Sequence, residues 1–243
     1  MNPKLIPWVF VWIWSTGFIA AKYGLPYAEP FTLLSYRFVI TLFFLLILII
    51  YKKSPWPETR LDFFHLLIAG VLIHGVYLGG VFQALKWGMP AGLGAMVIGL
   101  QPIGMALVAG VLLKEEVSKK QWTGLIMGLV GLYLVLFDSL DLTEQIAFDG
   151  FPIWAVFAVI ISLFAISIGT IYQKRFCSNM NLYSGAWVQY FSASILCILI
   201  VLFFENGEVS WSRTFILAMT WQVLGLSIGA ILLLMTMIKK DAL

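Results

Sequence analysis

The chain alternates long apolar runs with short polar connections. A helix needs about 20 apolar residues to cross the hydrocarbon core of a bilayer. Eight runs of roughly that length lie near 5–21, 31–51, 61–85, 91–113, 119–137, 150–173, 182–204 and 214–238. No segment alternates apolar and polar positions over the length of a membrane-spanning strand, and an open sheet cannot satisfy its backbone in lipid. The pattern therefore predicts an all-α membrane protein, a polytopic helical bundle with eight transmembrane helices.

Composition supports a bilayer environment. Of 243 residues, 61% are hydrophobic and 11% are charged, and the mean hydropathy is +0.97. Soluble domains have about 25% charged residues. The two cysteines, Cys177 and Cys197, have no metal-type spacing and suggest no disulfide framework, so we expect neither a metal nor another cofactor. The first apolar run has no small-residue cleavage site, so we expect no separate signal peptide.

Basic residues are unequally divided between alternate connections. One set of connections holds eleven: Lys4, Lys52, Lys53, Arg60, Lys114, Lys119, Lys120, Lys174, Arg175, Lys239 and Lys240. The other set holds three, which are Lys22, Lys86 and Arg213. The positive-inside rule predicts that the N-terminus and the Leu243 end are cytoplasmic, in the cell (inner) membrane. The net charge of +3 is thus a topology signal, and we expect no nucleic-acid partner.

The chain also shows an internal repeat. A gapless shift of 153 residues lays 13–50 over 166–203 and aligns Lys22 with Arg175. The first unit has five helices, an odd number, so a second copy must enter the membrane inverted, as in many transporters. The sequence therefore predicts two inverted five-helix repeats.

The two predicted repeats differ in length. The first covers 1–138 and the second covers 150–243, and the shift maps Leu243 onto Pro90. Residues 91–138, which hold two helices, then have no partner in the second unit. We therefore expect the second repeat to be incomplete, and we expect a 243-residue form to transport poorly unless it dimerises or the natural product continues.

Several local motifs resemble one known family. They are the run from Trp14 to Gly24 (WSTGFIAAKYG), Tyr36-Arg37-Phe38, Gln83-Ala84-Leu85-Lys86, Gly99-Leu100-Gln101-Pro102 and Leu112-Leu113-Lys114-Glu115. Together they resemble EamA-type permeases of the drug/metabolite transporter superfamily. The resemblance implies ten helices, both ends in the cytoplasm, and transport of small metabolites, often outward. This chain departs from that pattern because it has eight apolar runs.

Polar residues inside apolar runs are the candidates for a substrate site. Gln101 precedes Pro102, which removes a helix hydrogen bond and exposes a carbonyl. Gln83 and Gln101 have amides that can bind a polar solute or join two helices. His74, with Tyr77 on the same helix face, either lines a cavity or makes a helix–helix hydrogen bond.

Two further candidates lie in the first run. Trp14 is deeper than the other tryptophans of its run, and Ser15 follows it. The tentative substrate-binding set is therefore Trp14, Ser15, His74, Tyr77, Gln83 and Gln101. Arg37 belongs to a family-like motif but can also snorkel to the interface.

Small residues suggest helix packing. Gly124, Gly128 and Gly131 indicate close helix packing or a dimer contact. Gly225-Leu226-Ser227-Ile228-Gly229 matches a nucleophile-elbow pattern, but it lies within a predicted helix and no histidine follows it. We interpret it as a packing face.

These observations favour a transporter. The predicted activity is movement of a small organic metabolite, amino-acid-like or drug-like, by alternating access and in the outward direction. The predicted partners are the substrate, the lipid bilayer and a second copy of the chain in a homodimer. One alternative is a truncated, non-transporting membrane protein. The other is an intramembrane enzyme, which would need titratable groups clustered at one depth, and the sequence has no such cluster.

Overall fold

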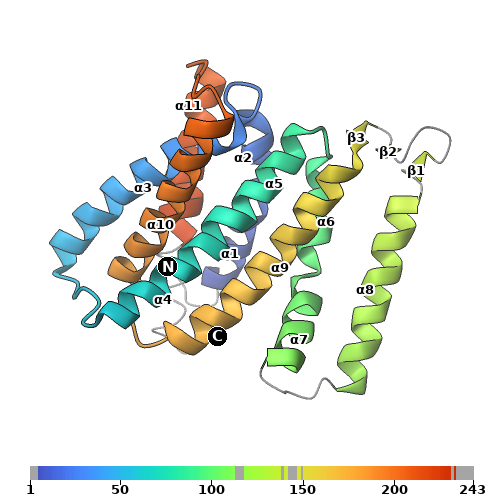
Figure 1. The fold of residues 1–243 in the computed structure, drawn as a ribbon, viewed down its shortest axis with the longest axis horizontal. Coiled ribbons are helices and arrows are strands. Elements are labelled where there is room, and N and C mark those ends of the chain that lie inside the picture. Colours follow the sequence, from blue (N-terminus) through green and yellow to red (C-terminus); the bar gives the residue numbers. More distant parts are fainter. Residues whose placement is uncertain are drawn as a thin grey trace.

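The computed structural model describes residues 5–112, 118–137, 140–141, 147–148, 150–230 and 233. The ends of the predicted helices at 113 and 238, most of the acidic loop and both termini lie outside these residues. The described chain is built mainly from helices, arranged as tilted, neighbouring rods (Figure 1).

The helices of the first half follow the predicted apolar runs. They are α1 (Ile6–Ser15), α2 (Gly17–Gly24), α3 (Pro30–Lys52), α4 (Arg60–Gly70), η2 (Val71–Val76), α5 (Tyr77–Lys86), α6 (Ala91–Gly99), α7 (Gln101–Leu112) and α8 (Lys119–Phe137). The second half consists of α9 (Ile153–Phe176), α10 (Leu182–Phe204), α11 (Arg213–Thr220) and η3 (Trp221–Gly229). The segments η2 and η3 are π-helical.

Five described helical segments are long and apolar enough to cross a membrane. They are Pro30–Lys52, Arg60–Lys86, Ala91–Val108, Ile153–Phe176 and Leu182–Phe204. Large apolar side chains on their outer faces are exposed, among them Phe43, Ile47, Phe157 and Leu202. Lipid does not penalise such exposure, because its tails are as apolar as the side chains. The protein is therefore an all-α, multi-pass membrane protein.

Two predicted continuous helices are interrupted. The run at 5–21 forms two helices because the chain turns at Thr16, whose hydroxyl donates to the Ile13 carbonyl at 2.6 Å. The run at 91–113 is divided between α6 and α7 at Leu100, just before Gln101-Pro102. Proline has no backbone N–H to donate to the preceding turn, which explains the second break.

A small sheet lies in the connection between α8 and α9. The strands β1 (Leu140–Asp141), β2 (Ala147–Phe148) and β3 (Phe151–Pro152) pair antiparallel in that order. Each strand has two residues, so none could cross a bilayer. The sequence pattern did not predict this sheet.

Equivalent helix starts recur in the two halves. Thr59 accepts a hydrogen bond from the Asp62 N–H before α4, and Ser212 accepts one from the Phe215 N–H before α11. Both pairs of positions differ by 153, the offset predicted from the sequence. Each helix then passes into a π-helical segment, η2 or η3. A hydroxyl that accepts from an N–H of the first turn stabilises a helix start. The same type of cap therefore starts the corresponding helix in each half.

Glycines set the close contacts of the central bundle. A side chain at Gly70 would collide with the Gln189 backbone of α10, and one at Gly80 would meet the Ala158 carbonyl of α9. Small residues let helix backbones approach closely in a membrane. The packing of α4 on α10 and of α5 on α9 therefore depends on these two positions.

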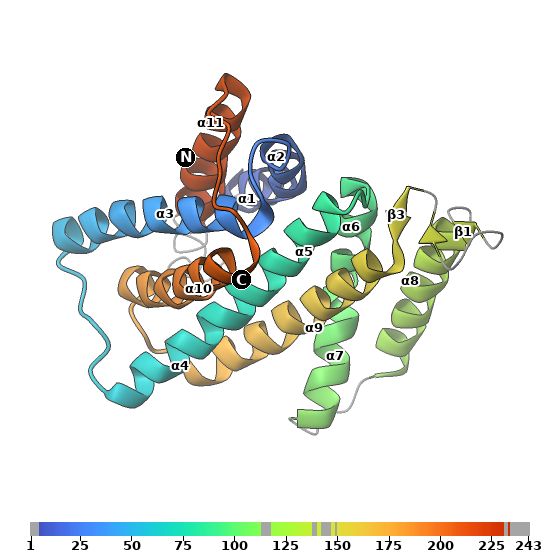
Figure 2. The same ribbon diagram turned by 45° about the horizontal axis from the view of Figure 1, so that its top comes forward.

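The predicted glycine face of α8 differs. In both views α8 lies at the edge of the molecule, away from α3 and α10 (Figures 1 and 2). Within the described residues, a Cβ at Gly124 or Gly131 would meet nothing within 4 Å, and only Gly128 faces side chains, those of Leu100 and Ile103. Among the described residues, Gly124 and Gly131 therefore have no close neighbour, and their role in packing or in a dimer contact stays a prediction.

The packing interpretation of the Gly225–Gly229 motif also changes. A Cβ at Gly225 would meet the Trp221 ring, and one at Gly229 would meet the Leu224 carbonyl, both on the same segment as the glycine. The motif lies in η3, which is π-helical. These glycines therefore accommodate the geometry of their own helix rather than a neighbouring one.

Candidate substrate cavity

A cavity of about 190 Å³ lies between the two halves of the described chain. In the first half, α1, α2, α3, η2 and α5 contribute lining residues, and in the second half α9, α10 and η3 do. Its lining residues are Phe10, Trp14, Gly17, Phe18, Arg37, Ile73, His74, Tyr77, Leu78, Val81, Phe82, Gln173, Leu182, Ala186, Gln189, Tyr190, Leu226 and Ala230. Most are apolar or aromatic, and a few polar groups lie among them, which is the usual make-up of a small-molecule site.

Three of the six predicted site residues reach this cavity. Trp14 lines it with 51% of its surface exposed, and His74 and Tyr77 line it from η2 and α5. The His74 ring stacks on Tyr190 at 4.2 Å between centroids. A half-buried imidazole packed on an aromatic ring is held in one orientation, so its nitrogens can present a defined donor or acceptor to a solute.

The other three predicted residues lie elsewhere. The Ser15 hydroxyl donates to the Trp12 carbonyl of its own helix at 2.9 Å. The Gln101 amide donates to Thr170 Oγ1 at 3.3 Å, which joins α7 to α9. Neither these two residues nor Gln83 is part of the cavity lining. Gln101 therefore has the helix-joining contact that was the alternative to substrate binding.

Arg37 is the permanently charged residue of the described lining, and the predicted set omitted it. Its side chain is 6% exposed and lines the cavity, so the snorkelling interpretation is wrong. Its Nε donates to Ser227 Oγ at 3.1 Å and its Nη1 donates to Gln222 Oε1 at 3.5 Å. Both acceptors lie on η3, in the other half of the chain. The signal available in the sequence was an arginine seven residues inside a 23-residue apolar helix, since intramembrane cations are expensive and usually functional.

The polar centre of the cavity repeats with the sequence offset. Arg37 and Tyr190 differ by 153 positions, as do His74 and Ser227. Arg37 bonds Ser227 across the two halves, and Tyr190 stacks on His74 across the same boundary. His74 lies in η2 and Ser227 lies in η3, so both π-helical segments meet the centre. π-Helical turns occur frequently at functional sites.

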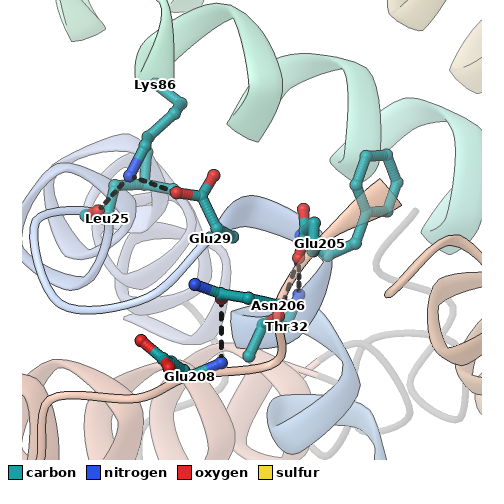
Figure 3. Close-up of polar contacts among 8 residues, drawn as sticks. Leu25, Glu29, Thr32, Lys86, Glu205, Asn206 and Glu208 are labelled. Atoms are coloured by element: carbon teal, nitrogen blue, oxygen red, sulfur yellow. Dashed lines mark hydrogen bonds and ion pairs between the residues drawn. The ribbon is translucent and has the colours of Figure 1, made fainter. Parts of the chain in front are cut away.

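One end of the bundle is tied by a polar network (Figure 3). The Glu205 carboxylate, just after α10, accepts from the backbone N–H groups of Phe31 and Thr32 at 2.9 and 2.7 Å, and from the Thr32 hydroxyl. These N–H groups open α3 and have no partner within their own helix. A carboxylate at a helix N-terminus is also favoured by the helix dipole. Glu205 thus caps a helix of the opposite half.

Further bonds secure the same end. Lys86 pairs with Glu29 at 3.1 Å and donates to the Leu25 carbonyl at 3.4 Å (Figure 3). The Ser210 N–H donates to the Tyr27 carbonyl at 2.8 Å. Lys86 thus joins the end of α5 to the start of α3. The connections at 25–29 and 205–212 are therefore held together beyond the cavity.

The opposite end of the bundle is tied less strongly. The Ser184 hydroxyl donates to the Pro55 carbonyl at 2.6 Å, and His65 Nδ1 lies 2.6 Å from the Tyr172 hydroxyl. The cavity lining extends toward this end as far as Gln173 and Leu182, where α9 ends and α10 begins. The two ends of the cavity are thus unequal in the described structure.

The described residues offer no obvious place for a metal. Within the described ranges, no three His, Cys, Asp or Glu side chains gather as ligands. The cavity lining itself contains one imidazole, two amides and one guanidinium, and it contains no carboxylate. Such a set can bind a polar solute through hydrogen bonds and charge.

The fold and the cavity define a class: a multi-pass helical membrane protein with a solute-sized cavity between its two halves. Residues 7–137 match the model of the EamA-like transporter family. This match covers more than half of the chain, so the protein belongs to that family.

Curated relatives agree with this assignment. The chain is 26% identical over 163 residues to a protein of Salmonella typhimurium named "Probable amino-acid metabolite efflux pump", covering 67% of this chain and 50% of that one. It is 28% identical over 156 residues to the uncharacterized transporter YyaM of Bacillus subtilis, covering 59% and 50%. A 26% identical relative from Chlamydia muridarum is named an S-adenosylmethionine/S-adenosylhomocysteine transporter, with 59% and 46% covered. The chain thus spans about half the length of these relatives.

A solved structure has the same fold. It is the crystal structure of a protein that is 21% identical in sequence, with a TM-score of 0.63. The match covers 96% of this chain and 77% of that one. The likeness extends beyond the family match, into α9, α10 and η3.

Proposed function

We propose that this protein is a membrane transporter that moves a small organic metabolite through the cavity between its two halves. The observation that carries the proposal is the position of the cavity: both halves of a family member line it, and its walls include residues of the long apolar helices. The name of the Salmonella relative, an efflux pump for amino-acid metabolites, supports an amino-acid-like solute and the outward direction.

Alternating access is the mechanism that the geometry favours. Transport requires the cavity to open to one side at a time, by rocking one half against the other. The end with Glu205 and Lys86 is held closed by charge-assisted bonds, while the cavity extends toward Gln173 and Leu182 at the other end. We propose that this arrangement is the state open to the cytoplasm, the side from which an exporter loads.

Two inverted repeats, 1–138 and 150–243, would supply the two moving halves. The equal offset between the Thr59 and Ser212 caps and between the Arg37 and Tyr190 positions supports this organisation, as does the π-helical segment that follows each capped helix. We propose eight crossings with both ends in the cytoplasm. This orientation puts the connections that are rich in lysine and arginine on the cytoplasmic side, as the positive-inside rule requires.

The proposed orientation can be tested with reporter fusions. A fusion at Lys53, between α3 and α4, is expected to report from the cytoplasm because that connection is basic. A fusion at Gly150, before α9, is expected to report from the outside. A reporter pair such as alkaline phosphatase and green fluorescent protein reads both positions. An outside signal at Lys53 would overturn the orientation.

Substrate contact is proposed for the cavity residues Trp14, His74 and Tyr77. Ser15, Gln83 and Gln101 are proposed to act through the helices that carry them, because their side chains lie outside the cavity lining. Trp14 offers an aromatic face, and His74 and Tyr77 offer hydrogen-bonding groups to a solute in an apolar surround.

Efflux measurements test this function. Cells expressing the protein are preloaded with radiolabelled amino acids, 2-oxo acids and short monocarboxylates, and release is followed over time. We expect Trp14→Ala and His74→Ala to slow release about tenfold, since the loss of one good contact of about 1.4 kcal/mol changes affinity by that factor.

Trp8→Ala is the matched control for Trp14→Ala. Trp8 is on the same helix, is exposed and does not line the cavity. It is expected to keep release within about twofold of the parent, because changes at exposed sites usually alter stability by less than 0.5 kcal/mol. Equal membrane amounts of each variant are verified by immunoblot. Equal release by all variants, or no accelerated release over empty cells for any solute, would contradict the proposed function.

A further inference from the structure

Arg37 is a buried cation without a carboxylate partner in the described structure. Its hydrogen bonds reach Ser227, Gln222 and Tyr190, which are neutral side chains. Within the described ranges, the ion pair of the structure joins Lys86 to Glu29, at the end of the bundle, and the cavity lining holds no Asp or Glu. A charged side chain inside a membrane is expensive, so one that remains there has a partner or a function.

The guanidinium is held in place rather than free to move. Gln222, which accepts from Arg37, donates its own amide to the Ala20 carbonyl at 3.2 Å, so the contact connects α3, η3 and α2. Gln222 and Ser227 are fully buried. An arginine has five N–H donors in a planar fork that fits a carboxylate. Nε and Nη1 donate to Ser227 and Gln222, and Arg37 also hydrogen-bonds Tyr190, so part of the donor set remains for a solute in the cavity that Arg37 lines.

The surroundings of Arg37 divide the cavity into a polar part and an apolar part. Tyr77, Gln189 and Tyr190 line the cavity with Arg37 and can donate or accept hydrogen bonds. Phe10, Trp14 and Phe18 form an aromatic part. The cavity volume of about 190 Å³ is smaller than the roughly 300–1,000 Å³ that is typical of sites for drug-sized ligands. The site thus suits a compact molecule with one anionic end and an apolar body.

We propose that Arg37 binds the carboxylate of the transported solute, and that the preferred substrate class is a small organic monoanion with an aromatic or aliphatic body. A free amino acid would fit less well, because its ammonium group would find no carboxylate in the described lining. The inference rests on the proposed function, and it adds the substrate class and the residue that selects it.

Binding to the purified full chain in nanodiscs tests the proposal. The probes share one body: 3-phenylpropionate, its neutral amide 3-phenylpropanamide, phenylalanine and 2-phenylethylamine. Isothermal titration is expected to show that 3-phenylpropionate binds at least tenfold more tightly than 3-phenylpropanamide. Phenylalanine is expected to bind more weakly than 3-phenylpropionate, and 2-phenylethylamine is expected to bind most weakly of the four. Equal binding of carboxylate and amide by the parent protein would overturn the proposal, whatever the variants do.

Variants then assign the preference to Arg37. Arg37→Gln is expected to bind the carboxylate and the amide equally, and Arg37→Lys is expected to keep a reduced preference, since it retains charge without the planar fork. Arg213→Gln is the matched control, because Arg213 is exposed and outside the cavity. If Arg37→Gln does not fold, the proposal is still tested by two measurements: the carboxylate preference of the parent protein, and the reduction of that preference in Arg37→Lys. A full carboxylate preference in a folded Arg37→Gln protein would refute the assignment.

The same measurements separate this inference from the proposed function. Carboxylate binding that depends on Arg37, without efflux of any solute, would remove the transport proposal and leave the anion site. Efflux that depends on Trp14 and His74, with no binding preference for the carboxylate probe, would leave transport and remove the anion site.

Discussion

Replacing Gly70 by leucine is expected to leave little folded protein in the membrane. The new Cβ would collide with the Gln189 backbone of α10 and with the Ser192 hydroxyl. Ser192 cannot turn aside without losing its bond to the Leu67 carbonyl at 3.0 Å. Overpacking commonly costs about 1–3 kcal/mol where side chains can adjust. Here a backbone must move, so the α4–α10 contact must open and the cost is larger.

A second position and a matched control extend the test. Gly80→Leu is expected to behave like Gly70→Leu, because it would meet the Ala158 carbonyl of α9. Gly124→Leu introduces the same side chain on α8, where the described residues leave open space. Fluorescence-detected size-exclusion chromatography in mild detergent reads the folded fraction of each variant. A normal monodisperse peak for Gly70→Leu would contradict the packing.

The Gly124 control also addresses the proposed homodimer. If α8 packs against a second copy, Gly124→Leu should shift the elution to a smaller species while leaving the folded amount unchanged. Loss of folded protein would instead indicate packing within the chain. The control therefore separates the two roles that the sequence suggested for this glycine face.

The sequence predicted the helical segments well because bilayer thickness limits their length. The predicted ranges 119–137 and 182–204 coincide with α8 and α10, and α3 differs from its prediction by one residue at each end. The charge and hydropathy of such a segment are local properties, so they can be read from neighbouring residues. The same holds for the repeat offset of 153, which recurs in the helix caps.

The candidate site was less predictable because its contacts join distant segments. Arg37 and Ser227 are 190 positions apart and meet across two halves of the chain. The sequence placed Ser227 in a packing motif and placed Gln101 in the cavity, because one helix alone does not reveal which face meets which neighbour. The π-helical turns add to this, since they rotate the following residues relative to a regular helix and so change that face.

Removing the Glu205 carboxylate is expected to release the closed end of the bundle. In the structure Glu205 accepts two backbone bonds and one hydroxyl bond from the start of α3 (Figure 3). Hydrogen bonds to a charged group contribute about 1.5–3 kcal/mol each. Glu205→Ala leaves the Phe31 and Thr32 N–H groups without this acceptor, so the closed arrangement should lose at least about 1.4 kcal/mol, a tenfold shift in population.

Cysteine labelling measures this shift. Val81→Cys places a thiol of similar size on the cavity wall in the middle of α5. The two native cysteines are expected to give little background labelling. Cys197 is buried. The pKa of the Cys177 thiol is raised to about 11, mainly by burial and to a smaller extent by the Asp62 carboxylate. Thiols react as thiolates, so Cys177 stays unreactive at neutral pH. A membrane-impermeant maleimide is added to intact cells.

The expected result is that Val81→Cys alone is labelled slowly from outside and that adding Glu205→Ala accelerates labelling about tenfold or more, in proportion to the open population. Glu208→Ala is the matched control, because this neighbouring carboxylate is exposed and the described bond of the residue uses its backbone N–H. Removing Glu208 changes the same loop by one negative charge without removing an α3 cap. Labelling that rises equally in both variants would indicate a general effect of charge on the reagent, and unchanged labelling in Glu205→Ala would show that the cap does not hold this end closed.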